Sequence, residues 1–308
     1  MAEAARNYTA RDFLHPRDGL NWLALLFLRT VAVLPLPLIW FLGAALGSLL
    51  YFLMPERRYI TLTNLRACFP ELSPKEQRRR ARAHFRAFTQ AVLATPISWW
   101  GSKKRMQRLA RLIGRQHFDQ ALTGTRPVIL LVPHFVAMDM AGMALAPDFF
   151  MTTMYKRPKN RFFDYVMRSR RGRFGGLVIE RHGGIKPVVR ALREGRSFYY
   201  LPDQDQGRQG AVFAPFFGVQ AATLTALSRL AAITGAVVIP CFPKQLAWGR
   251  GYELVFQPPI ENFPTDDLLA DTVRMNGIIE DAVRTMPEQY FWSHRRFKTR
   301  PEGEGPFY

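Results

Sequence analysis

The fold is decided by one short stretch of the sequence, PVILLVPHFVAMD at residues 127–139. Its first half is an apolar run of strand length that is bounded by Pro127 and Pro133. Its second half changes to a helical pattern, which we expect to cover residues 138–145. His134 and Asp139 are the polar residues at this junction. The stretch therefore predicts a strand, a loop and a helix in close succession.

Further strands and helices alternate along the rest of the chain. Alternation of this kind is typical of an α/β fold with helices on the faces of a central sheet. We therefore predict an α/β fold with a mixed central sheet, formed by one domain without internal repeats. Strands are expected at 127–133, 150–155, 176–179, 197–201, 236–242 and 253–256, and helices at 138–145, 161–171, 185–193, 223–233 and 266–286.

The composition excludes several classes of protein. The 308 residues include 43 Lys or Arg against 24 Asp or Glu, a formal charge of +19, and 48% are hydrophobic. This hydrophobic content excludes intrinsic disorder. The two cysteines, Cys68 and Cys241, exclude a disulfide scaffold and are expected to be free thiols. The positive charge implies an anionic partner: nucleic acid, an anionic lipid surface or an acidic carrier protein.

The charge is absent from one part of the chain. Arg29 and Glu56 enclose 26 uncharged residues, most of them apolar. The segment 31–54 is long enough to cross a bilayer, although Pro35 and Pro37 would kink or delay a helix. A buried helical hairpin and a cleaved signal peptide are the alternatives; the signal peptide fits poorly because no small-residue cleavage site follows. We predict a membrane anchor, either spanning or lying deep in the interface, with the remainder of the chain in the cytoplasm.

A basic helix is predicted after this anchor, over residues 73–95. Ser73, Pro74 and Glu76 form a typical helix start. From Arg78 to Arg115 the sequence contains 11 Lys or Arg and no acidic residue. A basic amphipathic helix near the paired Trp99 and Trp100 indicates binding to a membrane surface, with a solvated face as the alternative.

The junction residues His134 and Asp139 could carry chemistry. A carboxylate that contacts one imidazole nitrogen fixes the tautomer, and the other nitrogen is then free to deprotonate a hydroxyl group. If His134 lies in the loop and Asp139 in the next helical turn, the two side chains can meet. The alternative is a capped helix beside an incidental histidine.

Other polar residues follow the later strands. Asp203 and Asp205 come after the fourth strand, at the edge where α/β sheets place ligand sites. Such paired carboxylates could bind Mg²⁺, but without a third carboxylate at metal spacing a structural role is favoured.

The sequence lacks several common motifs: no zinc spacing, Gly-x-Ser-x-Gly elbow, Walker loop or dinucleotide fingerprint is present. These absences exclude a serine hydrolase, a P-loop nucleoside triphosphatase and a dehydrogenase with a dinucleotide-binding fold. Further polar candidates lie on or beside the stretch after the second predicted strand: Arg157, Asn160, Asp164 and Arg171.

Specific motifs are spread over almost the whole chain. They are Asn64-Leu65, Cys68 to Glu71, the His134/Asp139 pair, Tyr155 to Asn160, Pro202 to Asp205, Val212 to Gly218, Ala222-Thr223, Trp292, and the run from His294 to Pro301. In these motifs the chain resembles the bacterial lipid A biosynthesis acyltransferases, the late lauroyl and myristoyl transferases of the lipopolysaccharide pathway. The C-terminal run and the Asp203 segment are the most specific of them.

The resemblance implies a reaction and a set of site residues. The reaction is transfer of an acyl chain from acyl carrier protein to a hydroxyl group of a lipid A precursor, without a cofactor or a metal. His134 is implied as the general base with Asp139 as its orienting partner, and Arg171 and Asp203 as members of the catalytic site. The segment from Leu177 to Gly184 departs from the family's pattern, so no role is assigned to Arg181. The residues expected to bind substrate are Tyr155, Arg157, Asn160, Asp205, Arg295 and Arg296, of which the last two could instead lie in a solvated basic tail.

The resemblance also implies an organisation of the chain. We expect an N-terminal segment over 1–60 that holds the anchor at about 31–54, and an acyltransferase domain over 61–308 with a glycerolipid-acyltransferase-like fold. The expected location is the cell inner membrane, with the catalytic domain facing the cytoplasm. Acyl carrier protein, the lipid A precursor and anionic membrane lipids are the expected partners, and nucleic acid is not.

The sequence allows alternatives for the phenylalanines and for the activity. Phe149, Phe150, Phe162 and Phe163, together with Phe213, Phe216 and Phe217, could line an acyl tunnel or simply pack in the core. The chain could also acylate another glycolipid or a lysophospholipid, or be a basic membrane-surface protein without enzymatic activity. Nucleic-acid binding would leave the apolar anchor and the His134/Asp139 pair unexplained.

Overall fold

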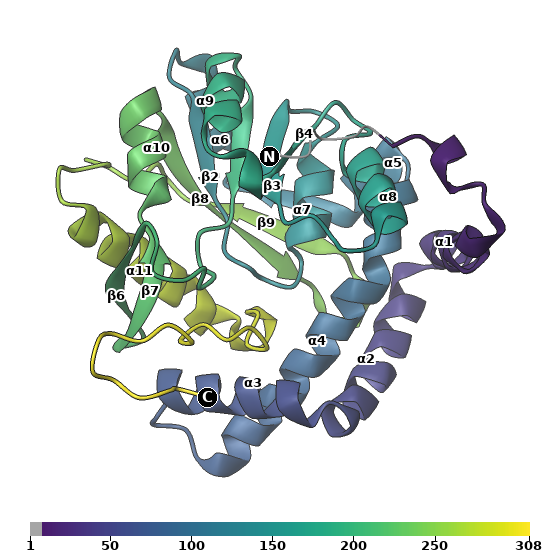
Figure 1. Ribbon diagram of the computed structural model, residues 1–308, viewed down its shortest axis with the longest axis horizontal. Coiled ribbons are helices and arrows are strands. Elements are labelled where there is room, and N and C mark those ends of the chain that lie inside the picture. The colour runs from purple at the N-terminus through teal and green to yellow at the C-terminus, as the bar shows by residue number, and fades with distance from the viewer. Residues whose placement is uncertain (1–7) are drawn as a thin grey trace.

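The computed structural model describes residues 8–308 and is built around a seven-stranded sheet (Figure 1). The strand order is β1-β9-β8-β2-β5-β3-β4, and all neighbours are parallel except β8 and β9. This mixed α/β sheet confirms the predicted fold class. The strands are β1 (Ala110–Ile113), β2 (Val128–Leu131), β3 (Met151–Tyr155), β4 (Leu177–Glu180), β5 (Ser197–Tyr200), β8 (Val237–Gln245) and β9 (Tyr252–Phe256).

The central strand β2 is buried on both faces of the sheet. Ile129 and Leu131 belong to a core formed with α9, α10 and α11. Val128 and Leu130 belong to a second core on the opposite face, formed with α6 and α7. Burial on both faces explains why this strand reads as a continuous apolar run. The helices around the sheet are α5 (Lys103–Leu109), α6 (Arg115–Thr123), α7 (Met138–Leu145), α8 (Arg161–Arg171), α9 (Lys186–Arg193), α10 (Ala226–Thr234) and α11 (Leu268–Thr285).

A separate antiparallel hairpin consists of β6 (Ala211–Phe216) and β7 (Val219–Leu224). Its turn residues Phe217 and Gly218 have φ angles of 51° and 76°. Two consecutive positive φ values are typical of the tight turns that match the twist of a hairpin. The helix predicted from residue 223 therefore begins only at Ala226, because Thr223 and Leu224 belong to β7.

The N-terminal part of the chain is helical. The helices are α1 (Gly19–Val33), α2 (Leu36–Leu53), α3 (Pro55–Cys68) and α4 (Pro74–Trp100), and the first seven residues of the predicted segment 1–60 lie outside the described residues. The predicted start of α4 is confirmed, because Ser73 and Glu76 form a capping box. The predicted stretch 31–54 is divided between two helices, since Leu34 and Pro35 have extended backbone angles. The break follows from Pro35, which disfavours helical geometry in the residue before it.

Helix α2 packs against α4 along one face. Gly43 and Gly47 lie on this face, where an added Cβ would come within 2.6 Å of Gln90 Cα and 2.5 Å of Phe85 O, respectively. Only glycine allows such a close backbone approach. Within residues 8–308, α2 is the one helix that is long and apolar enough to cross a membrane.

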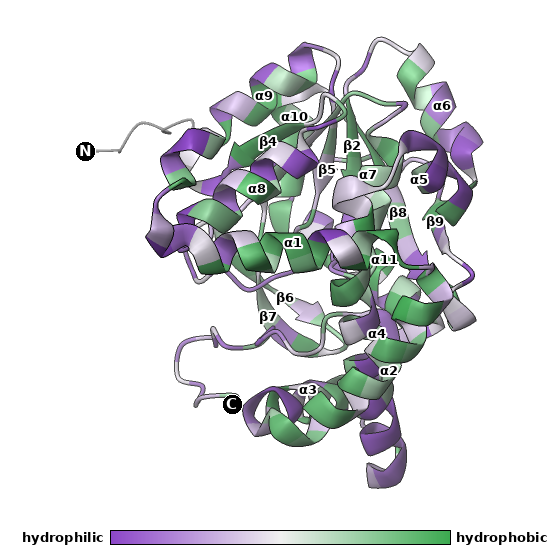
Figure 2. Ribbon diagram, turned by 90° about the vertical axis from the view of Figure 1, so that its right-hand side faces the viewer, coloured by the Kyte–Doolittle hydropathy of each residue, from purple (hydrophilic) through white to green (hydrophobic). Residues whose placement is uncertain are grey.

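The C-terminal segment returns to α3, and both views place the C-terminus beside this helix (Figures 1 and 2). Asn64 on α3 donates hydrogen bonds from Nδ2 to the carbonyl oxygens of Trp292 (2.7 Å) and His294 (2.8 Å). The Tyr308 hydroxyl donates to Asn64 Oδ1 over 2.5 Å. Asn64 therefore fixes the C-terminal run to the N-terminal helices. Cys68 and Cys241 are free, as predicted, and both are buried.

Candidate active site

The centre of the candidate site is a pair formed by His134 and Asp203. His134 follows β2 and Asp203 follows β5, and these strands are neighbours in the sheet. His134 Nδ1 lies 2.7 Å from Asp203 Oδ1, and the His134 backbone N–H donates to Asp203 Oδ2 over 2.9 Å. The carboxyl ends of parallel strands meet at one edge of a sheet, and this brings the two loops together.

The surroundings of Asp203 keep its carboxyl group ionised. Its burial opposes ionisation, but the His134 charge, the two hydrogen bonds from His134 and the Arg296 charge together lower the pKa below the ordinary value. An ionised carboxylate can only accept, so His134 donates the hydrogen bond from Nδ1–H to Asp203 Oδ1. Nε2 is then the basic nitrogen of the imidazole.

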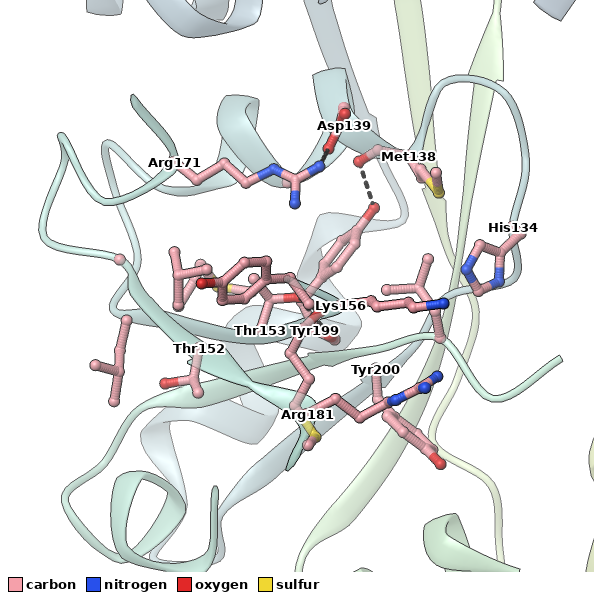
Figure 3. Close-up of a pocket in the computed structure, with 18 of the residues that line it drawn as sticks. His134, Met138, Asp139, Thr152, Thr153, Lys156, Arg171, Arg181, Tyr199 and Tyr200 are labelled. Carbon is pink, nitrogen blue, oxygen red and sulfur yellow. Dashed lines mark hydrogen bonds and ion pairs between the residues drawn. The ribbon is translucent and has the colours of Figure 1, made fainter. Parts of the chain in front are cut away.

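The predicted contact between His134 and Asp139 is wrong. Asp139 lies in the first turn of α7, where its Oδ1 pairs with Arg171 Nη2 over 2.5 Å. Figure 3 shows this pair along one wall of the cavity, with His134 apart from it. The helix begins at Met138 and carries the Asp139 side chain away from the loop that holds His134. Asp203 occupies the place at Nδ1 that was expected for Asp139.

A cavity of about 560 Å³ adjoins His134. Its walls combine apolar side chains with a few polar ones, as is usual for a small-molecule site. Figure 3 shows Arg171 and Asp139 from α8 and α7, and Tyr199 from β5, around this space. The apolar side chains at the cavity are methionines, aliphatic residues and tyrosines rather than the phenylalanines considered for an acyl tunnel. The methionines are Met138, Met143, Met151, Met154 and Met167. Phe162, Phe216 and Phe217 are instead buried in the hydrophobic cores.

The predicted residues after β3 are held together by Asp164. Tyr155 lines the cavity and donates its hydroxyl proton to Asp164 Oδ1 over 2.8 Å. Arg157 donates from Nε to Asp164 Oδ2 over 3.0 Å. Asn160 caps α8 by accepting the Phe163 N–H, and its amide donates to Asn21 on α1. Of these predicted substrate-binding residues, Tyr155 alone lies among the cavity-lining residues.

The other predicted substrate-binding residues organise the loops behind the site. Asp205 accepts the N–H of Thr299 over 2.7 Å and its hydroxyl over 2.8 Å. Arg296 is buried and donates to Ala222 O and Thr223 Oγ1. Arg295 is exposed and pairs with Glu56 over 3.1 Å. Contact of any of the three with substrate stays a prediction.

Sequence reasoning assigned no role to four residues near the site. Lys156 and Arg181 line the cavity. His294 accepts the Asp205 N–H at Nε2, and burial together with the neighbouring His134 charge lowers its pKa to about 4. Tyr290 borders Asp203, and its burial and the Asp203 charge raise its pKa. His294 and Lys156 lie in motifs that the resemblance used, but nothing in the sequence pattern connects Tyr290 to the site. Among residues 8–308, no group of three or more His, Cys, Asp or Glu is placed to hold a metal ion.

Comparison with known proteins identifies relatives over nearly the whole chain. The profile of the bacterial lipid A biosynthesis acyltransferases matches residues 7–299. The Escherichia coli (strain K12) lipid A biosynthesis lauroyltransferase is 34% identical over 94% of this chain and 95% of its own. The corresponding palmitoleoyltransferase is 33% identical and covers 97% of both chains, and the myristoyltransferase is 33% identical over 96% and 91%.

One solved structure also aligns with this chain. The 1-acyl-sn-glycerophosphate acyltransferase PlsC from Thermotoga maritima aligns with 81% of this chain and 97% of its own, at 13% identity and a TM-score of 0.37. The relationships to the E. coli enzymes are much stronger. On the profile match and these relatives, the chain belongs to the bacterial lipid A biosynthesis acyltransferase family.

Proposed function

We propose that this protein transfers a fatty acyl chain from acyl carrier protein to a hydroxyl group of a lipid A precursor at a membrane surface. One observation carries the proposal: His134, whose Nδ1 is paired with Asp203, lines a largely apolar cavity of about 560 Å³. Such a cavity suits a hydrocarbon chain, and a carboxylate-oriented imidazole suits deprotonation of an alcohol. Family membership supports this reading.

The reaction proceeds through direct attack by the acceptor. His134 Nε2 takes the proton of the acceptor hydroxyl, and the oxygen forms a bond to the thioester carbonyl carbon. The carbon–sulfur bond then breaks, and the carrier thiolate takes the proton back from His134. Asp203 stabilises the imidazolium that forms between these steps. No acyl-enzyme is required, because the acceptor oxygen is itself the nucleophile.

Arg171 is the candidate for stabilising the developing oxyanion. Its side chain lines the cavity, and Asp139 fixes its guanidinium group through the ion pair. Donors that are already positioned where charge develops contribute strongly to catalysis. In this mechanism Asp139 orients Arg171 rather than His134.

The surface formed by α1, α2 and Trp248 is the proposed membrane contact. α2 exposes large apolar side chains opposite its α4 face, and Trp248 packs against Trp40 with 5.0 Å between the ring centroids. Figure 2 shows α1 and α2 as predominantly hydrophobic ribbons. The exposed apolar residues of this surface are Leu20, Leu23, Leu26, Phe27 and Val33 on α1, Leu38, Phe41, Leu42, Leu46, Leu49, Phe52 and Leu53 on α2, and Trp248.

The neighbours of α2 favour a helix that lies in the interface over one that crosses the bilayer. Arg86 donates to Ser48 Oγ over 2.8 Å, and the Arg82 guanidinium lies 5.3 Å from the ring centroid of Tyr51. A spanning α2 would carry these guanidinium groups into the hydrocarbon layer, where charges are costly. At the interface they would meet anionic headgroups. The proposed location is the inner membrane with the catalytic domain on the cytoplasmic side.

Mass spectrometry of lipid A tests the function in cells. Lipid A from cells that lack this protein should be missing one acyl chain, which the wild-type gene restores and the His134→Ala variant does not. The variant must be present at the wild-type level in the membrane fraction. Unchanged lipid A in the deleted cells would refute the proposal, and a change confined to phospholipids would indicate a lysophospholipid acceptor.

A further inference from the structure

The charge of the cavity lining is unbalanced. Three cationic side chains line it, those of Lys156, Arg171 and Arg181, against one carboxylate, that of Asp139. Asp139 is already paired with Arg171. Among the described residues, neither the Lys156 nor the Arg181 side chain has a hydrogen bond or an ion pair. The cavity therefore holds two cations without a protein partner.

The two unpaired cations point to the same part of the cavity. Lys156 follows β3 and Arg181 follows β4, and these strands are neighbours in the sheet. Figure 3 shows the charged ends of Lys156 and Arg181 extending toward the side where His134 lies, with Arg171 and Asp139 on the other wall. A ligand at His134 would meet both charges at once.

We infer that Lys156 and Arg181 form a site for a phosphate ester of the substrate beside the proposed general base. Arginine and lysine together suit a phosphate group, since the guanidinium fork can bind two oxygens and the ammonium group adds a point charge. A fatty acyl chain, the other expected occupant of the cavity, carries no charge that could neutralise them. The inference rests on the proposed function. Within it, two phosphates are available: that of the phosphorylated glycolipid acceptor and that of the carrier's phosphopantetheine arm.

Binding of inorganic phosphate tests the site without any reaction. The probe is the ³¹P line width of inorganic phosphate in the presence of the full-length detergent-solubilised protein. Wild type should broaden the line, and the Lys156→Met/Arg181→Met double variant should not. Lys159→Met and Arg190→Met are matched controls, because both residues are exposed and neither lines the cavity. Equal broadening by wild type and the double variant would overturn the inference, as would an equal loss in the controls.

Kinetics then identify the source of the phosphate. If it belongs to the acceptor, the double variant should raise KM for the phosphorylated acceptor by roughly tenfold or more, and should lose the preference over an enzymatically dephosphorylated acceptor. If it belongs to the carrier, KM for acyl carrier protein should rise instead, while a short acyl thioester without phosphate reacts equally with both proteins. No change in either KM would overturn the inference. Loss of phosphate binding in a protein that acylates none of the acceptors would refute the proposed function and leave the phosphate site standing.

Discussion

His134 and Asp203 are joined by two hydrogen bonds, one from the imidazole Nδ1 and one from the histidine's own backbone N–H. The same carboxylate therefore fixes the ring and the loop that carries it. Asp203 is only 1% exposed, so water does not compete for its oxygens. This arrangement sets the direction of Nε2 before any substrate binds.

Replacement of Asp203 by Asn should lower kcat by about 10³–10⁴-fold, since an amide no longer stabilises the imidazolium and can impose the wrong tautomer. KM should change little, because Asp203 does not line the main cavity. Steady-state kinetics with acyl carrier protein substrates measure both parameters. Asp139→Asn is the matched comparison, and its loss in kcat should be smaller. A larger loss in Asp139→Asn than in Asp203→Asn would contradict the assignment of Asp203 as the principal partner of the general base.

The replacement Arg171→Met should lower kcat by roughly 10²–10³-fold if this arginine stabilises the oxyanion. Asp139→Asn should show a smaller loss, because it only releases Arg171 from its orientation. The double variant separates the roles: with Arg171 absent, loss of Asp139 should cost nothing more. Additive losses in kcat would show that Asp139 acts on something other than Arg171.

The pairing of His134 with Asp203 lay beyond sequence reasoning for a topological reason. The two residues are 69 positions apart, and they meet because β2 and β5 are adjacent in the sheet. Strand order is not encoded in any local pattern, whereas His134 and Asp139 are close in sequence and suggested a contact that helix geometry prevents. The resemblance to a family nevertheless brought Asp203 into the candidate site.

The strands of the sheet could be predicted where they are buried. β2 and β5 are buried along their full length and read as compact apolar runs. β1 was missed because it is an edge strand of alternating exposure that follows a basic helix directly. The β6–β7 hairpin was missed because its turn, Phe217-Gly218, lacks the usual Asn-Gly or Asp-Gly signal and Pro215 interrupts the strand pattern.

Substitution of Trp248 and Phe41 by Ser should weaken binding to vesicles of phosphatidylethanolamine and phosphatidylglycerol. The two side chains are 59% and 53% exposed and lie on the proposed membrane surface. Losing two large apolar groups that insert into lipid costs about 1.5–3 kcal/mol each, so the vesicle-bound fraction should fall markedly in a sedimentation assay. Ile233→Ser on α10, at 56% exposure, is the control. Unaltered binding by the double variant would exclude this surface as the membrane contact.

Packing of α2 on α4 predicts a stability effect at Gly47. A valine there would place its Cβ against the Phe85 carbonyl oxygen, a backbone atom that cannot move aside easily. The expected destabilisation is about 1–3 kcal/mol. Thermal unfolding should show a lower Tm for Gly47→Val than for Ala45→Val, where the side chain is exposed. Equal Tm values for the two variants would mean that α2 is not held on α4 in this way.

Acid should destabilise the protein through His84, which is buried beside the carbonyl oxygen of Glu288 and the hydroxyl of Ser293. Its burial lowers the pKa from 6.5 to about 4, so between these values the unfolded chain binds a proton that the folded chain excludes. Stability from this residue is therefore complete above pH 6.5 and is lost as the pH falls toward 4, by about 2 kcal/mol between pH 7 and pH 5. Denaturant unfolding at a series of pH values measures the slope. His84→Phe should have a flatter slope than wild type whatever its overall stability, whereas His15→Gln, at an exposed position, should keep the wild-type slope. If His84→Phe and wild type lost stability in parallel as the pH fell, the acid sensitivity would arise from another group. His294, whose pKa is also lowered to about 4, would be the next residue to replace.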